Sequence, residues 1–122
     1  MQGTESAKID RVNFTRCESN GVFLSGYNKG AEIRRSSFEW LGASAIASEG
    51  FSKAAPDEEH SPEADAPRRQ VPLPAGVGVD ATDGEYPQGT RISDVWVHDI
   101  GLLQKQSSAY FQAVTCCATI ER

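Results

Sequence analysis

The sequence has no excess of positive charge, no long apolar run and few cysteines. Among its 122 residues, 12 Lys and Arg stand against 17 Asp and Glu, which gives a formal net charge of -5. Nucleic acids and anionic membranes require a basic face on their partner, so neither is expected to bind this chain. No apolar run approaches the about 18 residues of a membrane span, so none is predicted.

The N-terminus carries no targeting pattern. Its first ten residues, MQGTESAKID, lack the basic stretch followed by an apolar stretch that marks a signal peptide. The sequence therefore assigns no compartment, and an extracellular location stays open if the chain is an N-terminally truncated fragment.

The three cysteines are Cys17, Cys116 and Cys117. An odd count with one adjacent pair is not a disulfide framework. No CxxC pair and no histidine cluster accompanies them, so no metal site is predicted. Cys17 occupies the same position in a repeat as Leu41, which favours a small buried apolar residue over a reactive thiol.

A repeat dominates the first half of the chain. IDRVNFTRCESNGVFLSG begins at Ile9, and IRRSSFEWLGASAIASEG begins 24 residues later at Ile33. The apolar pattern returns from Ile92 and starts once more at Ile120. A period in this range is typical of solenoids, in which each repeat buries its apolar face against its neighbours.

Within each repeat, period-two alternation predicts short strands with one buried face. Strands are expected at Val12–Phe14, Val22–Leu24 and Tyr110–Val114, with a polar lead-in over residues 1–8. A short helix over Ala43–Ala47 remains an alternative to strand at that point. The predicted inward positions are Ile9, Val12, Phe14 and Cys17, then Ile33, Phe38 and Leu41, then Ile92, Val95, Val97 and Ile100, with Ile120 above Ile92.

An insertion of about 35 residues interrupts the repeat, because 41 residues from Phe51 to Arg91 replace a six-residue linker, Tyr27 to Glu32. Residues 52–75 are acidic and proline-rich with hardly a large apolar side chain, so a disordered insertion is predicted there. Turns are expected further on, including one at Tyr86–Gly89.

Stacking the repeats predicts an all-β fold, a parallel β-helix of about three coils plus a partial fourth in one domain spanning residues 1–122. An antiparallel sandwich is the alternative, but it does not require one inward pattern to recur at a fixed shift. The chain stops as a coil begins and shows no capping helix, so we expect a fragment of a longer β-helix that aggregates or folds poorly in isolation.

Two stretches, residues 21–50 and 76–116, resemble right-handed parallel β-helix proteins of the pectin-lyase-like superfamily. They look most like large eukaryotic members without a settled activity. The most specific part is the pattern GxxxKQSSAYFQAxxC, here Gly101 to Cys116. The resemblance implies a right-handed helix, and it implies that an enzyme here would be a polysaccharide lyase, an epimerase or a glycoside hydrolase. Since the superfamily also contains tail-fibre proteins, the fold alone does not select a reaction.

Residues between the inward positions are expected to face solvent in rows across the coils. Glu39 and His98 should then be neighbours on adjacent strands, with Asp99 in the next row. These three are the candidate catalytic residues, although an exposed Glu–His pair is more often a solvated strand face. The rows are Asn13, Ser37 and Trp96; Thr15, Glu39 and His98; and Arg16, Trp40 and Asp99.

The same face supplies the candidate substrate-binding residues Arg16, Trp40 and Trp96. Aromatic faces can hold the apolar side of a sugar ring while charged groups bind its hydroxyls and carboxylates. Both tryptophans could instead be partly buried cover for a sheet or loop.

No cofactor is expected. Asp80, Asp83 and Glu85 could offer oxygen ligands to calcium, but they lack the D-x-D-x-D-G spacing of a calcium loop. The sequence therefore leaves two hypotheses. One is a polysaccharide-binding domain, on its own or within a carbohydrate-active protein; the other is a non-catalytic structural or adhesive solenoid segment of a larger surface or secreted protein.

Overall fold

The computed structural model describes residues 1–50 and 85–122, in two segments separated by residues 51–84. All regular secondary structure in these two segments is β-strand. The predicted disordered insertion, residues 52–75, lies outside the described residues. Within the described segments, no helix has the length and apolar character needed to cross a membrane.

The strands are short, from two to four residues each. In chain order they are β1 (Thr4–Glu5), β2 (Lys8–Asp10), β3 (Asn13–Thr15), β4 (Val22–Ser25), β5 (Asn28–Lys29), β6 (Glu32–Arg34), β7 (Ser37–Glu39), β8 (Ile46–Glu49), β9 (Pro87–Gln88), β10 (Arg91–Ser93), β11 (Trp96–His98), β12 (Tyr110–Ala113) and β13 (Thr119–Glu121).

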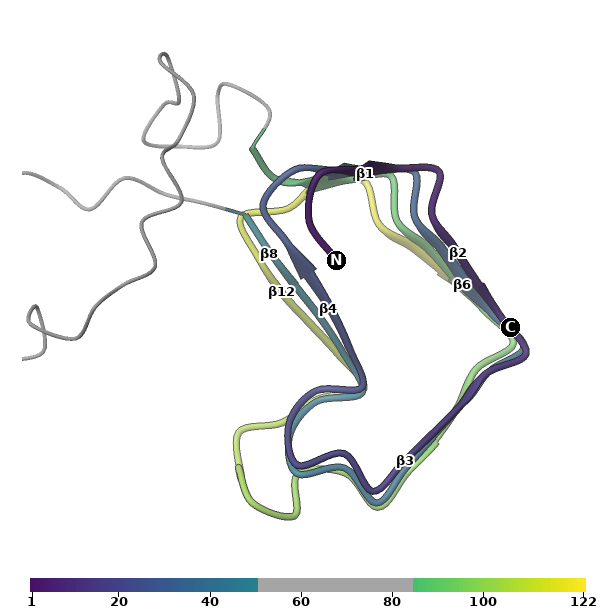
Figure 1. Ribbon diagram of the computed structural model, residues 1–122, viewed down its shortest axis with the longest axis vertical. Helices are drawn as coiled ribbons and strands as arrows, with labels where there is room; N and C mark the ends of the chain where they lie inside the picture. Colours follow the sequence, from purple (N-terminus) through teal and green to yellow (C-terminus); the bar gives the residue numbers. More distant parts are fainter. Residues whose placement is uncertain (51–84) are drawn as a thin grey trace, which may run out of the picture.

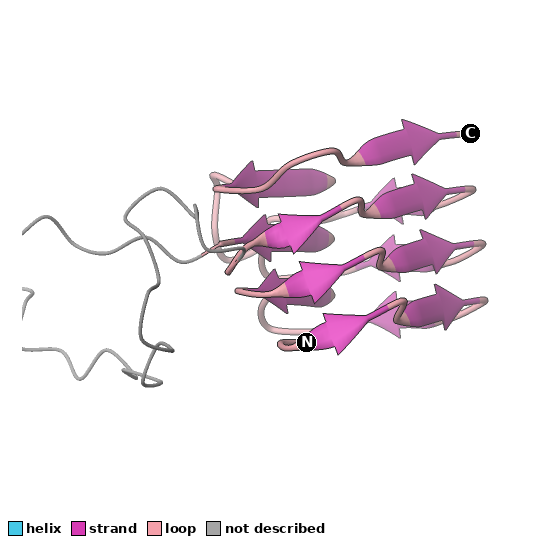
Figure 2. Cartoon of the chain, turned by 90° about the horizontal axis from the view of Figure 1, so that it is seen from above, coloured by secondary structure: helices cyan, strands magenta, loops and turns pink. Residues whose placement is uncertain are grey.

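These strands form four sheets with orders β1-β5-β9, β2-β6-β10-β13, β3-β7-β11 and β4-β8-β12. Every pairing among them is parallel. The chain visits the sheets in the same order three times and then begins a fourth passage, and successive passages lie one above another (Figures 1 and 2). We call each passage a layer; the arrangement is compatible with a β-solenoid.

The register confirms the repeat. Lys8 pairs with Glu32 and Val22 with Ile46, so both pairs have the shift that separates the two copies in the sequence. Glu32 in turn pairs with Arg91, which places the insertion between the second and third layers. The expected ladders are also confirmed, with Ile9 on Ile33 on Ile92 on Ile120, and Phe14 on Phe38 on Val97.

The core fills the space enclosed by the sheets, and it is tightest in the second layer. Ile33, Phe38 and Leu41 are completely buried there. The Phe14 and Phe38 rings stack in parallel with centroids 4.8 Å apart, which continues the ladder through side-chain contact. Cys17 packs against this cluster but is half-buried and not fully buried as predicted.

Strands end at bends where one residue adopts a left-handed backbone. After β3, β7 and β11 these residues are Arg16, Trp40 and Asp99, with φ of 57°, 54° and 49°. Because this conformation interrupts the alternation of side chains along a strand, it lets the chain turn a corner while the following residue points inward. Non-glycine residues occupy most of the corners, including Arg11, Arg35 and Asp94 after β2, β6 and β10.

Several expectations are wrong. Residues 1–8 are not merely a lead-in, since Thr4–Glu5 pairs with Asn28–Lys29 inside the expected linker. The turn expected at Tyr86–Gly89 contains strand Pro87–Gln88, which extends the same sheet. These strands are only two residues long, so they carry no alternation signal. Buried Asn28 organises this corner, because its amide group donates to the carbonyl oxygens of Ser25 and Gly26.

Two further corrections concern single positions. The helical alternative over Ala43–Ala47 is wrong, since strand β8 begins at Ile46. Val12 is predicted to point inward but is 39% exposed, whereas its counterpart Ser36 in the second layer is buried. Val12 lies between β2 and β3, and each of these is the end strand of its sheet among the described residues.

Candidate functional site

The outward side of the β3-β7-β11 sheet gathers the polar residues predicted to carry function. In each strand the central residue, Phe14, Phe38 or Val97, faces the core, so the flanking residues face solvent. The register places Asn13, Ser37 and Trp96 in one row and Thr15, Glu39 and His98 in the next. Two of the three predicted rows are therefore confirmed, while Arg16, Trp40 and Asp99 of the third lie at the bends that follow these strands.

His98 lies between two carboxylates. Its Nε2 is 3.2 Å from Oε2 of Glu39, and its Nδ1 is 2.8 Å from Oδ2 of Asp99. The structure thus brings the three candidate catalytic residues together, from two adjacent strands and the corner that follows β11. Both ring nitrogens face carboxylate oxygens, and only the imidazolium form can donate a proton to both at once.

A hydrogen-bonded chain extends this cluster across the layers. The hydroxyl of Ser37 donates to Oδ1 of Asn13 at 2.8 Å, and the Asn13 amide donates to Oε1 of Glu39 at 3.4 Å. The Trp96 ring meets the His98 ring edge to face, with centroids 6.2 Å apart. The sheet therefore carries a continuous polar strip with Trp96 on one side.

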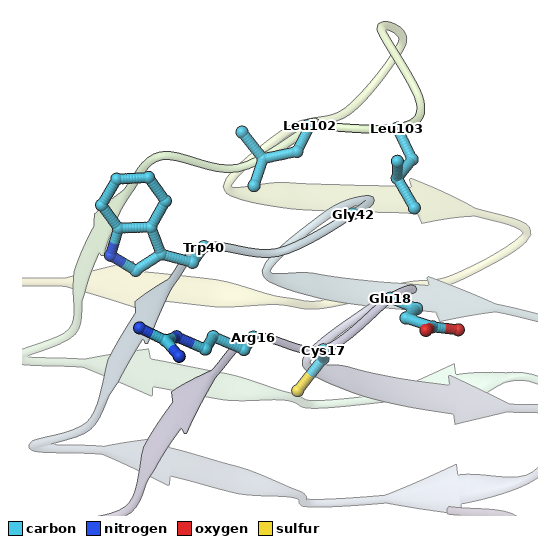
Figure 3. Close-up of a pocket in the computed structure, with 7 residues that line it drawn as sticks. All are labelled: Arg16, Cys17, Glu18, Trp40, Gly42, Leu102 and Leu103. Atoms are coloured by element: carbon cyan, nitrogen blue, oxygen red, sulfur yellow. The ribbon is translucent and has the colours of Figure 1, made fainter.

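An open hollow of about 390 Å³ borders this strip on the other side, around the corner after β7 (Figure 3). Trp40, which is 50% exposed, forms one wall, and Arg16 lies beside it in the layer below. Leu102 and Leu103 line the hollow from the third layer. The full lining is Arg16, Cys17, Glu18, Trp40, Gly42, Leu102 and Leu103.

The two leucines belong to a loop that is longer than its counterparts in the layers below. In the second layer, residues 40–45 connect β7 to β8, whereas in the third layer residues 99–109 connect β11 to β12. The longer loop bulges beyond the two beneath it (Figure 1). Backbone N–H groups of Leu103 and Gln104 donate to the carbonyl oxygen of Gly42, which anchors the loop to the second layer.

A second open hollow, of about 480 Å³, borders the strip at the corner before the sheet. Trp96, which is 68% exposed, lines this hollow together with the corner residues Arg11 and Arg35. The full lining is Arg11, Val12, Asn13, Arg35, Ser36, Ser37, Asp94 and Trp96.

The predicted binding residues are thus divided between two hollows. Arg16 and Trp40 share the first, while Trp96 lines the second, on the other side of the polar strip. Sequence reasoning missed Leu102 and Leu103. Two adjacent leucines after Gly101, outside the repeat pattern, were the available signal.

No metal site is present among residues 1–50 and 85–122. Glu39 and Asp99 contact opposite nitrogens of His98, so the three side chains do not converge on one point. Of the considered calcium ligands, only Glu85 falls in the described part of the chain; Asp80 and Asp83 lie outside it.

Comparison with protein-family models, with curated proteins and with solved structures finds no match to this chain.

Proposed function

We propose that this chain is a right-handed parallel β-helix domain that binds polysaccharide on the outward side of its β3-β7-β11 sheet. One observation carries the proposal: two strongly exposed tryptophans, Trp40 and Trp96, flank a polar strip on the β3-β7-β11 sheet. Exposing the apolar ring of tryptophan to water is unfavourable in free energy. A sugar ring has an apolar C–H face that can cover the indole, and its hydroxyl groups can hydrogen-bond to the polar strip.

The strip supplies partners for hydroxyl groups. Asn13, Ser37 and Glu39 form a hydrogen-bonded chain, and their exposed atoms can exchange water for sugar hydroxyls without moving the backbone. The parallel register fixes these groups, since each sits on a strand paired on at least one side. Such pre-organisation lowers the entropy cost of binding an extended chain.

The geometry favours binding over bond cleavage. A general base must present a free nitrogen or oxygen to the substrate proton. In His98 both nitrogens are already engaged by Glu39 and Asp99, and all three side chains are open to solvent. The proposed activity is therefore recognition of a polysaccharide by a β-helix domain of the pectin-lyase-like type that the sequence resembles.

Glycan binding by the folded chain tests the proposal. Trp40→Ala and Trp96→Ala should each weaken binding to the best polysaccharide on a glycan array by about tenfold, since a stacked aromatic is worth about 1–2 kcal/mol. Phe111→Ala is the matched control, because Phe111 is an exposed aromatic residue on a different sheet, β4-β8-β12. Equal losses in all three variants would contradict a site on this face.

The second candidate is a structural or adhesive solenoid segment without a glycan site. The continuous side-chain ladders favour it, because they account for the fold without any ligand. Absence of binding by a folded chain across uronate, neutral and amino-sugar polymers would select this alternative. A release assay on the same polymers, with Glu39→Gln and His98→Ala, tests catalysis separately; we expect no release by the unsubstituted chain.

A further inference from the structure

The adjacent thiols of Cys116 and Cys117 lie at a corner that the proposed glycan surface does not use. Cys116 forms a parallel bridge with Gln88, the last residue of β9, and so occupies the fourth level above the β1-β5-β9 sheet. Its N–H donates to the carbonyl oxygen of Pro87, and its carbonyl accepts from the N–H of Gly89. Two backbone hydrogen bonds therefore fix the position of this residue.

Neighbouring side chains on a strand normally point to opposite faces, which keeps adjacent thiols apart. Here Cys117 takes the left-handed corner conformation, with φ of 59°, which interrupts that alternation. As a result the two thiols lie in contact, with the Cys117 thiol donating to the Cys116 sulfur. Cys116 is half-buried and Cys117 is exposed, so a small reagent can reach the pair from solvent.

From this corner geometry we propose that Cys116 and Cys117 form a two-thiol site for trivalent, thiophilic metalloids of the arsenical type. A tetrahedral zinc site needs further ligands that the described residues do not bring. Pyramidal trivalent arsenic needs only two sulfurs from the protein, since its third bond goes to its own organic group. Two thiols held in contact at this corner supply that pair.

The chemistry requires no oxidant. An arsenoxide R–As=O reacts with the two thiols to form two As–S bonds; the As=O bond breaks, and its oxygen leaves as water with the two thiol protons. Arsenic stays trivalent throughout. The hydrogen bond to Cys116 raises the pKa of the Cys117 thiol, so this group enters the reaction with its proton.

Intact-mass spectrometry with phenylarsine oxide tests the site on the full 122-residue chain, after treatment with a phosphine reductant and its removal. We expect one adduct per chain, equal to the reagent less one water, that ethanedithiol reverses. Cys116→Ser and Cys117→Ser should each weaken binding about 100-fold, because the second thiol acts at high effective concentration. Cys17→Ser, which removes a thiol on another sheet corner, should bind like the unsubstituted chain.

Two results would overturn the proposal. One is undiminished binding in Cys116→Ser or Cys117→Ser; the other is no adduct while both thiols still react with a simple thiol reagent. A second measurement isolates the role of the fold: the folded chain should bind phenylarsine oxide several-fold more tightly than the urea-unfolded chain. Equal affinity would show that adjacency in sequence, and not the corner, accounts for the adduct.

Discussion

Single residues at the corners decide where the outward side chains of this chain point. Trp40 and Trp96 were both expected on one strand face, but only Trp96 lies within a strand. Trp40 follows its strand and has a positive φ, so its side chain lines the next corner. Backbone conformation at one residue is not encoded in period-two alternation, and this explains why the two tryptophans flank the polar strip instead of sharing a hollow.

Gly42 illustrates a position where no side chain fits. A Cβ there would overlap the carbonyl oxygen of Glu18 and would lie 3.1 Å from a methyl group of Leu103. We predict that Gly42→Ala lowers the free energy of unfolding by about 1–3 kcal/mol, because backbone must move to admit the methyl group. Urea denaturation followed by circular dichroism measures the change.

The matched control for that substitution is Gly89→Asn. Gly89 also lies at a corner, with φ of 62°, but an added Cβ there meets nothing within 4 Å. Asparagine tolerates the left-handed region, so the cost should be about 0.5 kcal/mol or less. Gly42→Ala no more destabilising than Gly89→Asn would show that the layers are looser at Gly42 than the structure indicates.

The hydrogen-bonded carboxylate of Asp10 should make the stability of the fold depend on pH in the acid range. Its carboxylate accepts hydrogen bonds from Arg35 and Arg34, and the bond from Arg35 contributes most to lowering the pKa of Asp10 below its ordinary value of 3.8. Stability from this cluster is therefore present above pH 3.8 and is lost as the pH falls through the lowered pKa. We predict that Asp10→Asn makes the melting temperature less dependent on pH between about pH 5 and pH 2.

Thermal melts across this pH range check the prediction, with Glu121→Gln as the control. Glu121 lies on β13 of the same sheet but takes no part in the cluster around Asp10. An unchanged pH profile for Asp10→Asn would mean that other groups control the acid response.

At the scale of elements, the side-chain ladders hold the layers together. Phe38 is completely buried and stacks on Phe14, whereas Phe23 on β4 is 40% exposed. We predict that Phe38→Ala lowers the free energy of unfolding by about 3–5 kcal/mol. Phe23→Ala should cost about 1 kcal/mol or less, since it loses only cross-strand contact. Comparable losses in equilibrium denaturation would contradict a core centred on the second layer.

The same ladders explain how much of the fold the sequence could predict. In strands such as Ser37–Glu39 the central residue must be apolar because it faces the core. This apolar position recurs at a fixed shift along the chain, so the stacking of these strands could be predicted. Strands Thr4–Glu5 and Asn28–Lys29 contain no apolar residue, and their corner depends on the buried side chain of Asn28. They therefore produce no periodic apolar pattern from which they could be predicted.

In the candidate site, too, the contacts that follow from the repeat could be predicted from the sequence, and the others could not. The contact between Glu39 and His98 follows from aligning the copy that begins at Ile92 with the copy that begins at Ile33, and the sequence predicts it. The pairing of His98 with Asp99 required the left-handed bend at Asp99. Leu102 and Leu103 come from a loop that is lengthened outside the repeat, and no register could place them over Gly42.

At the scale of the whole molecule, burial is concentrated in the middle of the stack. Ile33 in the second layer is completely buried, while Ile120 at the fourth level is 60% exposed. Strand β13, which contains Ile120, has a partner on one side only among the described residues. An unpaired strand edge with an exposed isoleucine is a template for pairing with another chain.

This open edge predicts self-association of the 122-residue chain. The mass measured by light scattering should rise with protein concentration, and Ile120→Lys should reduce that rise, because a buried lysine would lose its hydration at a strand-to-strand contact. Leu103→Lys is the matched control: Leu103 is 75% exposed but lies in a loop and not on a strand edge. Equal effects of the two lysines would assign the association to general hydrophobicity, and a concentration-independent monomer would rule out association through this edge.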